Sequence, residues 1–181
     1  MGRCNVNSSS RESSSAKDAR RFRTRVLCLG NDLLADDSFA KVVHDHIREF
    51  FTPEVEVVST PESGFHLLDY VSNTQHLIVV DTIMTGRVPP GTILVFQEQE
   101  LQAAGGGSPH YIGLCEALAL ARQLGLEVAE DVMIVAVEAA DCTTVGGEMH
   151  SAVRAAVPSV IRIVRSLIHD SERTLSSAAS G

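Results

Sequence analysis

Short apolar runs alternate along the chain with segments in which apolar residues recur every three or four positions. The runs predict buried strands, at residues 25–30, 55–58, 76–81, 92–96 and 132–137. The longer-period segments predict amphipathic helices, at 36–51, 64–71, 114–124 and 151–169. Strands that are apolar throughout and alternate with helices are typical of a parallel sheet covered on both faces. The sequence therefore predicts an α/β fold, a three-layer α/β/α sandwich around a mostly parallel five-stranded sheet.

Three local features refine this prediction. Asp36 or Asp37 is placed to serve as the N-cap or as a first-turn acid of the helix at 36–51. Pro158 either kinks the last helix or lies near its start. Residues 98–112 form a predicted loop that contains three consecutive glycines and His110.

The two ends of the chain differ from its middle. Ser occupies six of the eight positions 8–15, and large apolar residues are rare there. We expect residues 1–24 to form a disordered Ser/Arg-rich leader and 171–181 a flexible tail, around a single domain at 25–170. Arg23 and Arg25 interrupt the apolar stretch that an export signal would need. The apolar run at 132–137 is too short for a membrane helix, so we expect no membrane association.

Charge and cysteine content narrow the classes of function. The formal net charge is −8, although residues 1–25 hold seven Lys or Arg against two acids, so the acidic surplus lies in the predicted domain. An acidic body repels phosphates, which excludes nucleic acid as a partner. Four cysteines, at positions 4, 28, 115 and 142, lack C-x-x-C spacing. Without an export signal, we expect them to be free thiols in the cytoplasm.

Polar residues gather where the predicted strands end. Asp37 follows the first strand, Asp81 ends the third, and His110 lies in the loop after the fourth. Ligands bind at the carboxyl ends of strands in such sheets, and two carboxylates with an imidazole suit a divalent metal. The plainer alternatives are a helix cap for Asp37, a strand-end acid for Asp81 and an exposed loop histidine for His110. The residues alone leave both interpretations open.

Other kinds of site fit less well. Residues 30–37 place three carboxylates where the phosphate of a dinucleotide would lie, and the chain contains no P-loop motif, so no organic cofactor is expected. A serine hydrolase would need a G-x-S-x-G elbow, which is missing. Cys142 is the loop candidate for a cysteine hydrolase. The other six histidines lack ligand spacing and are expected to be surface or packing residues.

Residues 30–37 (GNDLLADD) resemble the G-N-x-L-x-x-D-[DE] signature of the nickel-iron hydrogenase maturation proteases. The similarity continues through 76–83 (HLIVVDTI), 90–92 (PGT), 108–110 (SPH) and 153–158 (VRAAVP), in order and with compatible spacing. The resemblance implies an endopeptidase, aspartic-type or metal-assisted, that removes a C-terminal extension from a hydrogenase large-subunit precursor. It implies that cleavage follows nickel insertion, with nickel supplied by the precursor as the recognition signal. The family's metal-binding positions fall on Asp37, Asp81 and His110, with Asp37 and Asp81 also as the catalytic candidates.

Several residues depart from the family pattern. Cys28 takes the place of a glycine, and Ser59 stands where the family has an acid after the second strand. Glu62 could supply a carboxylate from nearby. A non-cleaving metal-checkpoint protein that binds the same precursor is therefore the alternative function. Nothing in the sequence calls for a partner subunit, so a monomer is expected.

Overall fold

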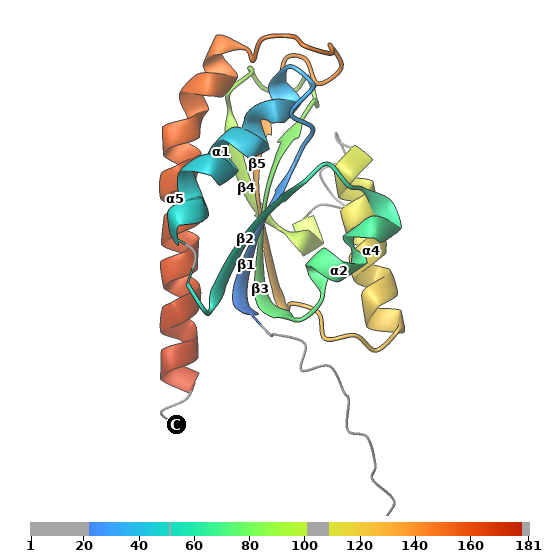
Figure 1. Ribbon diagram of the computed structural model, residues 1–181, viewed down its shortest axis with the longest axis vertical. Helices are drawn as coiled ribbons and strands as arrows, with labels where there is room; N and C mark the ends of the chain where they lie inside the picture. The colour runs from blue at the N-terminus through green and yellow to red at the C-terminus, as the bar shows by residue number, and fades with distance from the viewer. Residues whose placement is uncertain (1–21, 51, 101–108, 179–181) are drawn as a thin grey trace, which may run out of the picture.

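Five strands form one sheet in the computed structural model, which describes residues 22–50, 52–100 and 109–178 (Figure 1). Residues 1–21 of the leader predicted at 1–24 lie outside the described residues, as does the triple glycine, whereas residues 22–24 belong to the first strand and not to a disordered leader. The strands are β1 (Phe22–Leu29), β2 (Val55–Thr60), β3 (Thr74–Ile83), β4 (Ile93–Gln97) and β5 (Asp131–Glu138). Their order is β2-β1-β3-β5-β4, with β4 antiparallel to β5 and the other pairs parallel. The predicted mostly parallel sheet is confirmed.

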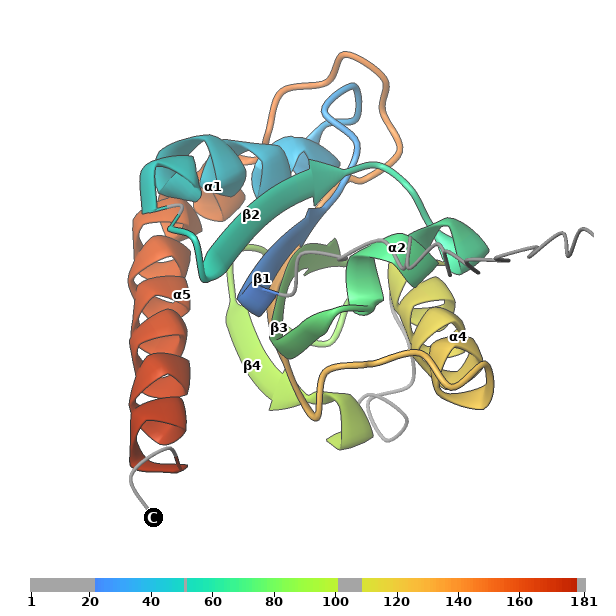
Figure 2. The same cartoon turned by 60° about the horizontal axis from the view of Figure 1, so that its bottom comes forward.

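Helices cover both faces of this sheet (Figure 2). On one face lie α1 (Phe39–Ile47) and α5 (Ser151–Ala178), and on the other α2 (Leu68–Val71) and α4 (Pro109–Gln123). Three short 3₁₀ turns, η1 (Asp36–Ser38), η2 (Arg48–Phe50) and η3 (Gly64–Leu67), flank α1 and precede α2. The three-layer α/β/α architecture predicted from the alternation of elements is therefore confirmed.

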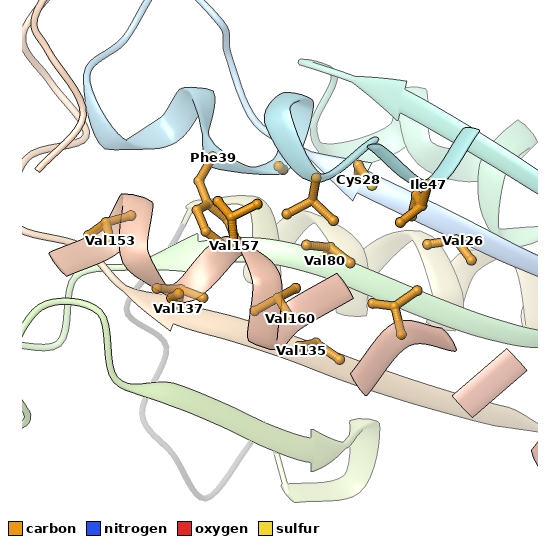
Figure 3. Packing of buried hydrophobic residues seen from close by; sticks show 14 of the residues in the cluster. Val26, Cys28, Phe39, Ile47, Val80, Val135, Val137, Val153, Val157 and Val160 are labelled. Atoms are coloured by element: carbon orange, nitrogen blue, oxygen red, sulfur yellow. The ribbon is translucent and has the colours of Figure 1, made fainter. Parts of the chain in front are cut away.

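The side chains of each central strand alternate between two apolar cores. Toward α1 and α5, Val26 and Cys28 of β1 pack with Val80 of β3 and with the inner face of α5 (Figure 3). Toward α2 and α4, Leu27 and Leu29 of β1 pack in the second core. Because both faces are covered, the central parts of β1, β3 and β5, at 26–29, 77–80 and 132–137, are apolar at every position, and this produces the runs seen in the sequence.

The connections that follow β1 and β2 lie on opposite faces of the sheet. The β1–β2 connection contains α1, whereas the β2–β3 connection contains α2 and crosses to the other side of β1. The strand order reverses between β1 and β3, and in sheets of this kind ligands bind beyond the carboxyl ends of the strands at such a point. The topology alone therefore predicts a ligand site at the carboxyl ends of β1 and β3.

The structure fixes two features of the predicted helices, the start of α4 and the position of Pro158. Helix α4 begins at Pro109, so His110 lies in the first turn of a helix and not in a loop. Proline suits the first helical position because its fixed φ is already helical and its missing N–H needs no partner there. Pro158 lies inside α5, well away from the start of that helix.

The last helix extends beyond the predicted end of the domain. Residues 171–178, expected to be part of a flexible tail, continue α5 as far as Ala178. Ser171 is buried, and its Oγ lies 2.9 Å from Thr24 Oγ1 and donates to the Ile168 carbonyl at 2.7 Å. This polar contact with β1 is long-range and leaves no periodic trace in the sequence. Within the described part of the chain, no helix is both long and apolar enough to cross a bilayer.

Arg25 belongs to the core of the domain rather than to a basic leader. Strand β1 begins at Phe22, and Arg25 is buried within it. Its guanidinium pairs with Glu56 on β2 and donates to the Tyr70 and Ser72 carbonyls at 2.7 and 2.8 Å, at the end of α2. A cation at a helix C-terminus satisfies carbonyls that lack intrahelical donors. Arg25 therefore fixes α2 to the sheet.

Replacing Arg25 tests this structural role. We expect Arg25→Met to lower the free energy of unfolding by about 3 kcal/mol, because it leaves Glu56 and the α2 carbonyls without their donor in a largely buried place. Chemical denaturation followed by circular dichroism measures the change. Arg23→Met is the matched control, since Arg23 is an exposed arginine of the same strand, and we expect a change within about 0.5 kcal/mol. Equal effects of the two substitutions would contradict the assignment.

Candidate active site

Two predicted site residues, Asp37 and Asp81, meet where β1 and β3 end. Asp37 lies in η1, which follows the turn after β1, and Asp81 lies near the end of β3. Thr82 joins them: its hydroxyl donates to Asp37 Oδ1 at 3.0 Å, and its backbone N–H donates to Asp81 Oδ1 at 2.7 Å. Asp37 is 6% exposed and Asp81 is fully buried. The structure thus brings together two carboxylates that are 44 residues apart in the sequence.

The turn after β1 orients Asp37 from its other side. The backbone N–H of Asn31 donates to Asp37 Oδ2 at 2.7 Å. A Cβ at position 30 would lie 2.3 Å from the Asp37 carbonyl oxygen, so only glycine allows this close approach. The Gly30-Asn31 pair of the sequence motif therefore serves to fold the chain back onto Asp37.

Asp36 has a different function from its neighbour. Its Oδ2 accepts from the N–H groups of Ala140 and Asp141 at 2.7 and 2.9 Å, and its Oδ1 accepts from the N–H of His150 at 2.6 Å. These three donors belong to the connection between β5 and α5. Asp36 lies in η1, whereas α1 begins at Phe39 with Ser38 at its N-cap and no acid in its first turn, so the predicted N-cap or first-turn acid is not found in α1. The carboxylate of Asp36 anchors another loop instead.

Cys142 lies beside the paired acids. Its Sγ is 3.5 Å from Thr82 Oγ1, in the same loop that Asp36 anchors. Burial raises the pKa of the Cys142 thiol to about 12, and the negative charges of the neighbouring carboxylates add to this effect. The thiol is therefore protonated at neutral pH, and the thiolate is the nucleophilic form. This environment argues against the cysteine-hydrolase alternative.

The third predicted ligand, His110, is placed only through its backbone. It lies in the first turn of α4, and that part of α4 packs against η3: a Cβ at Gly113 would lie 2.4 Å from the Gly64 nitrogen. The His110 side chain is outside the described part of the structure. Among the described side chains, no group of three or more His, Cys, Asp or Glu is arranged to hold a metal. The three-residue metal site therefore stays a prediction, of which the two carboxylates are seen together.

Two further candidates lie in β2 and in the segment after it. Ser59 is in β2, paired in register with Cys28. Glu62 lines a surface pocket of about 480 Å³ with residues that include Arg25, Glu56 and His66. That pocket lies toward α2, on the Arg25 side of the sheet. Glu62 is thus placed in different surroundings from those of Asp37 and Asp81.

The histidines outside the motif behave as expected. His46 Nδ1 lies 2.7 Å from the Val42 carbonyl oxygen, and His150 Nδ1 accepts from Ala152 N–H at 3.2 Å, near the start of α5. His44 and His169 lie beside acidic side chains that are close to them in the sequence, and the Nδ1 of His76 in β3 lies 3.5 Å from Asp131 of the neighbouring strand β5. These contacts are in keeping with surface or packing residues.

Thr82 and Glu138 were not among the site residues predicted from the sequence. Glu138 is a buried acid at the end of β5, where its carboxylate accepts from Thr85 N–H and Oγ1 and from Gly86 N–H at 2.7–2.8 Å. It holds the turn that follows β3. The sequence feature that points to both residues is a polar side chain at the carboxyl end of an otherwise apolar run.

The fold and this site define the class of the protein: a doubly wound α/β domain with paired, oriented carboxylates at its switch point. Comparison with known proteins gives the family. A family model described as hydrogenase maturation protease matches residues 40–167. The chain therefore belongs to the hydrogenase maturation protease family. The matched range contains Asp81 and His110 and begins just after Asp37.

Individual relatives agree with this assignment. The chain is 32% identical over 108 residues to the hydrogenase 2 maturation protease of Escherichia coli K12, covering 58% of this chain and 66%, slightly under two thirds, of that relative. It is 28% identical over 137 residues to the hydrogenase expression/formation protein HupD of Bradyrhizobium diazoefficiens, covering 73% and 70%. The structure of the hydrogenase maturating endopeptidase HybD from E. coli superposes with a TM-score of 0.73 at 26% identity, over 83% of this chain and 94% of that one.

The division of roles between Asp36 and Asp37 can be tested by stability. We expect Asp36→Ala to lower the free energy of unfolding by about 2–4 kcal/mol, because three N–H groups of the β5–α5 connection lose their acceptor. Amide hydrogen exchange of residues 139–150 should accelerate in the same variant. Asp32→Ala, at an exposed acid of the same turn, should change neither quantity measurably. Unchanged exchange in Asp36→Ala would contradict the anchoring role.

Proposed function

We propose that the protein is an endopeptidase that removes a C-terminal extension from the large-subunit precursor of a nickel-iron hydrogenase. Cleavage follows nickel insertion, and the nickel already held by the precursor is the recognition signal. Asp37, Asp81 and His110 contact this substrate-borne metal and so place the scissile bond beside the two carboxylates. The protein acts as a monomer in the cytoplasm, where its precursor is made.

The observation that carries this proposal is the joining of Asp37 and Asp81 through Thr82 in a chain of the maturation protease family. Two oriented carboxylates supply oxygen ligands for a divalent cation, and a histidine would add a nitrogen ligand suited to nickel. His110 is on the helix that packs against the segment after β2, so its backbone lies on the same side of the molecule as the strand ends. The relatives' names describe proteins of hydrogenase maturation, in agreement with such a substrate.

The proposed reaction is hydrolysis of one peptide bond. Water adds its oxygen to the carbonyl carbon, the carbon–nitrogen bond breaks, and the departing nitrogen takes a proton. The attacking water is activated either by Asp37 or Asp81 as a general base or by the substrate's nickel as a Lewis acid. In both routes the buried carboxylates are fixed in advance by Thr82 and Asn31, so little reorganisation is needed when the substrate arrives.

The second candidate function is a checkpoint protein that binds the nickel-loaded precursor without cutting it. It is favoured by Ser59, which stands in β2 where the family resemblance leads one to expect an acid. The two functions differ in one product: only the protease shortens the large subunit.

Incubation with a purified, nickel-loaded large-subunit precursor tests the proposal. We expect intact mass spectrometry to show a shortened large subunit and the released C-terminal peptide, and no cleavage of the nickel-free precursor. Asp37→Asn, Asp81→Asn and His110→Ala should each lower the rate by at least about 100-fold, because each removes a proposed contact with the metal.

Asp131→Asn is the control for these variants. Asp131 is an exposed acid at the start of β5, at the opposite edge of the same sheet, and we expect its replacement to leave the rate unchanged. Circular dichroism verifies that each variant is folded. Full processing by His110→Ala would refute the site, and binding of precursor without any shortening would establish the checkpoint function instead.

Thr82 offers a separate test of how the acids are positioned. Thr82→Val keeps the shape of the side chain and the backbone N–H bond to Asp81, and removes the hydroxyl that holds Asp37. We expect kcat for precursor cleavage to fall by about 10–100-fold with KM nearly unchanged. Thr82→Ser restores the hydroxyl and should recover most of kcat. A loss shared equally by both variants would mean that Thr82 acts through packing alone.

A further inference from the structure

The Thr82 hydroxyl has a second neighbour besides Asp37. Cys142 Sγ lies 3.5 Å from Thr82 Oγ1, which is a hydrogen-bond distance for a sulfur atom. Cys142 belongs to the connection between β5 and α5, 60 residues away from Thr82 in the sequence. Its side chain is partly buried, whereas Thr82 is 2% exposed. Two segments that are far apart in the chain therefore converge on one hydroxyl group.

The direction of the two hydrogen bonds follows from the hydrogen atoms available. A threonine hydroxyl carries one hydrogen and two lone pairs, and an ionised carboxylate only accepts. The Thr82 hydrogen is therefore directed at Asp37 Oδ1, at 3.0 Å. The contact with Cys142 must then use the thiol hydrogen, so the S–H donates to a lone pair of Thr82 Oγ1. The three groups form a chain in which the thiol donates to the hydroxyl and the hydroxyl donates to the carboxylate.

The surroundings of Cys142 keep its thiol in the form that can donate. Burial raises the pKa of this thiol to about 12, and the negative charges of Asp37, Asp36 and Asp81 add to the effect. A thiolate would have no hydrogen to give, and it would compete with Asp37 for the hydrogen of Thr82. At this place the thiol is thus a hydrogen-bond donor and not a nucleophile.

The backbone before Cys142 is fixed to the segment that carries Asp37. Asp141 N–H donates to Asp36 Oδ2 at 2.9 Å, and Asp36 N–H donates to the Asp141 carbonyl at 2.8 Å. Asp36 and Asp141 therefore hold each other in both directions. The residues that directly follow them, Asp37 and Cys142, both reach Thr82. This double connection sets the distance from the thiol to the hydroxyl without help from any substrate.

A donor at this position limits the orientations of the Thr82 hydroxyl. A hydroxyl hydrogen rotates to suit its neighbours, and the S–H of Cys142 leaves the direction of Asp37 as the favoured one. Successive hydrogen bonds in a chain also polarise and strengthen one another. Because S–H is a weak donor, we expect its contribution to be smaller than that of the Thr82 hydroxyl itself.

We propose that Cys142 is a positioning residue of the site, which fixes Asp37 through the hydroxyl of Thr82. The consequence for activity rests on the proposed function, in which Asp37 must be oriented before the substrate-borne metal arrives. The chain of hydrogen bonds itself does not depend on which reaction follows. Cys142 acts through Thr82 and touches neither the metal nor the scissile bond.

The first measurement needs no substrate. The S–H stretching band in the infrared moves to lower frequency when the thiol donates a hydrogen bond, and the difference spectrum between wild type and Cys142→Ala isolates the band of Cys142. In the Thr82→Val background we expect this band at higher frequency, because its acceptor is gone. The band of Cys115, a partly buried thiol on α4 isolated in the same way with Cys115→Ala, is the control and should not respond to Thr82→Val. A Cys142 band that is equal in both backgrounds, or missing, would overturn the proposal.

The second measurement follows cleavage of the nickel-loaded precursor. Cys142→Ala should lower kcat by about tenfold with KM nearly unchanged, the low end of the range for outer contacts of a metal site. Cys142→Ser keeps a donor at this position and should recover most of kcat. In the Thr82→Val background, Cys142→Ala should have no additional effect, because the two residues act in one chain. Cys115→Ala should leave kcat unchanged, and circular dichroism verifies that each variant is folded.

The outcomes separate positioning from other roles. An equal loss in Cys142→Ala and Cys142→Ser would mean that the sulfur itself is required, as in a metal ligand, and would overturn the proposal. Additive losses with Thr82→Val would also overturn it, because Cys142 would then act through packing and not through Thr82.

Failure of the proposed function is recognised separately. If wild type binds the nickel-loaded precursor without cutting it, the protease function fails, and the same variants are compared by their Kd for that precursor. Cys142→Ala should then raise Kd and Cys142→Ser should restore it, whereas an unchanged Kd overturns the positioning role. If wild type binds no precursor, the proposed function fails and the infrared comparison alone decides whether Cys142 holds Thr82.

Discussion

The parallel pairing of β1 with β3 is the constraint on which the site depends. It brings the turn after β1 beside the end of β3, so that Thr82 donates from its side chain across to Asp37 and from its backbone to Asp81. The reversal of strand order at the same pair keeps the connecting helices on opposite faces, the arrangement in which doubly wound sheets bind ligands at the strand ends. A shift in this register would move the two carboxylates apart without altering either sequence motif.

The neighbouring acids Asp36 and Asp37 show how one short motif serves both fold and site. Asp36 turns toward the connection between β5 and α5 and accepts three backbone N–H groups, while Asp37 turns toward β3. The loop that Asp36 anchors carries Cys142, whose Sγ lies 3.5 Å from Thr82 Oγ1 beside the acids. The Asp36 carboxylate thus positions a loop next to the site, even though it is directed away from Asp37.

Much of this could be predicted from the sequence, because the strands are buried on both faces and their apolar runs are unbroken. Asp37 and Asp81 were identifiable since topology alone places strand ends together. Long-range polar contacts were not: Arg25 was placed at the start of the first strand, but nothing in the sequence indicated that it pairs with Glu56 and donates to the carbonyls at the end of α2. Ser171 was placed in a tail, yet it contacts Thr24. Such contacts involve single residues, so no periodic pattern in the sequence indicates them.

The negative charge of the carboxylates at the site favours the binding of cations over anions. The carboxylates that raise the pKa of the Cys142 thiol disfavour any new negative charge there, and by the same sign they favour a cation. Asp37 and Asp81 are already buried, and this burial strengthens their interaction with a cation, because Coulomb interactions grow as the local dielectric falls. A partner that covered the two acids without bringing a cation would leave them unpaired in a buried place, whereas a cation supplies the charge that offsets them. The burial of the two carboxylates therefore makes the site sensitive to the charge of whatever binds there.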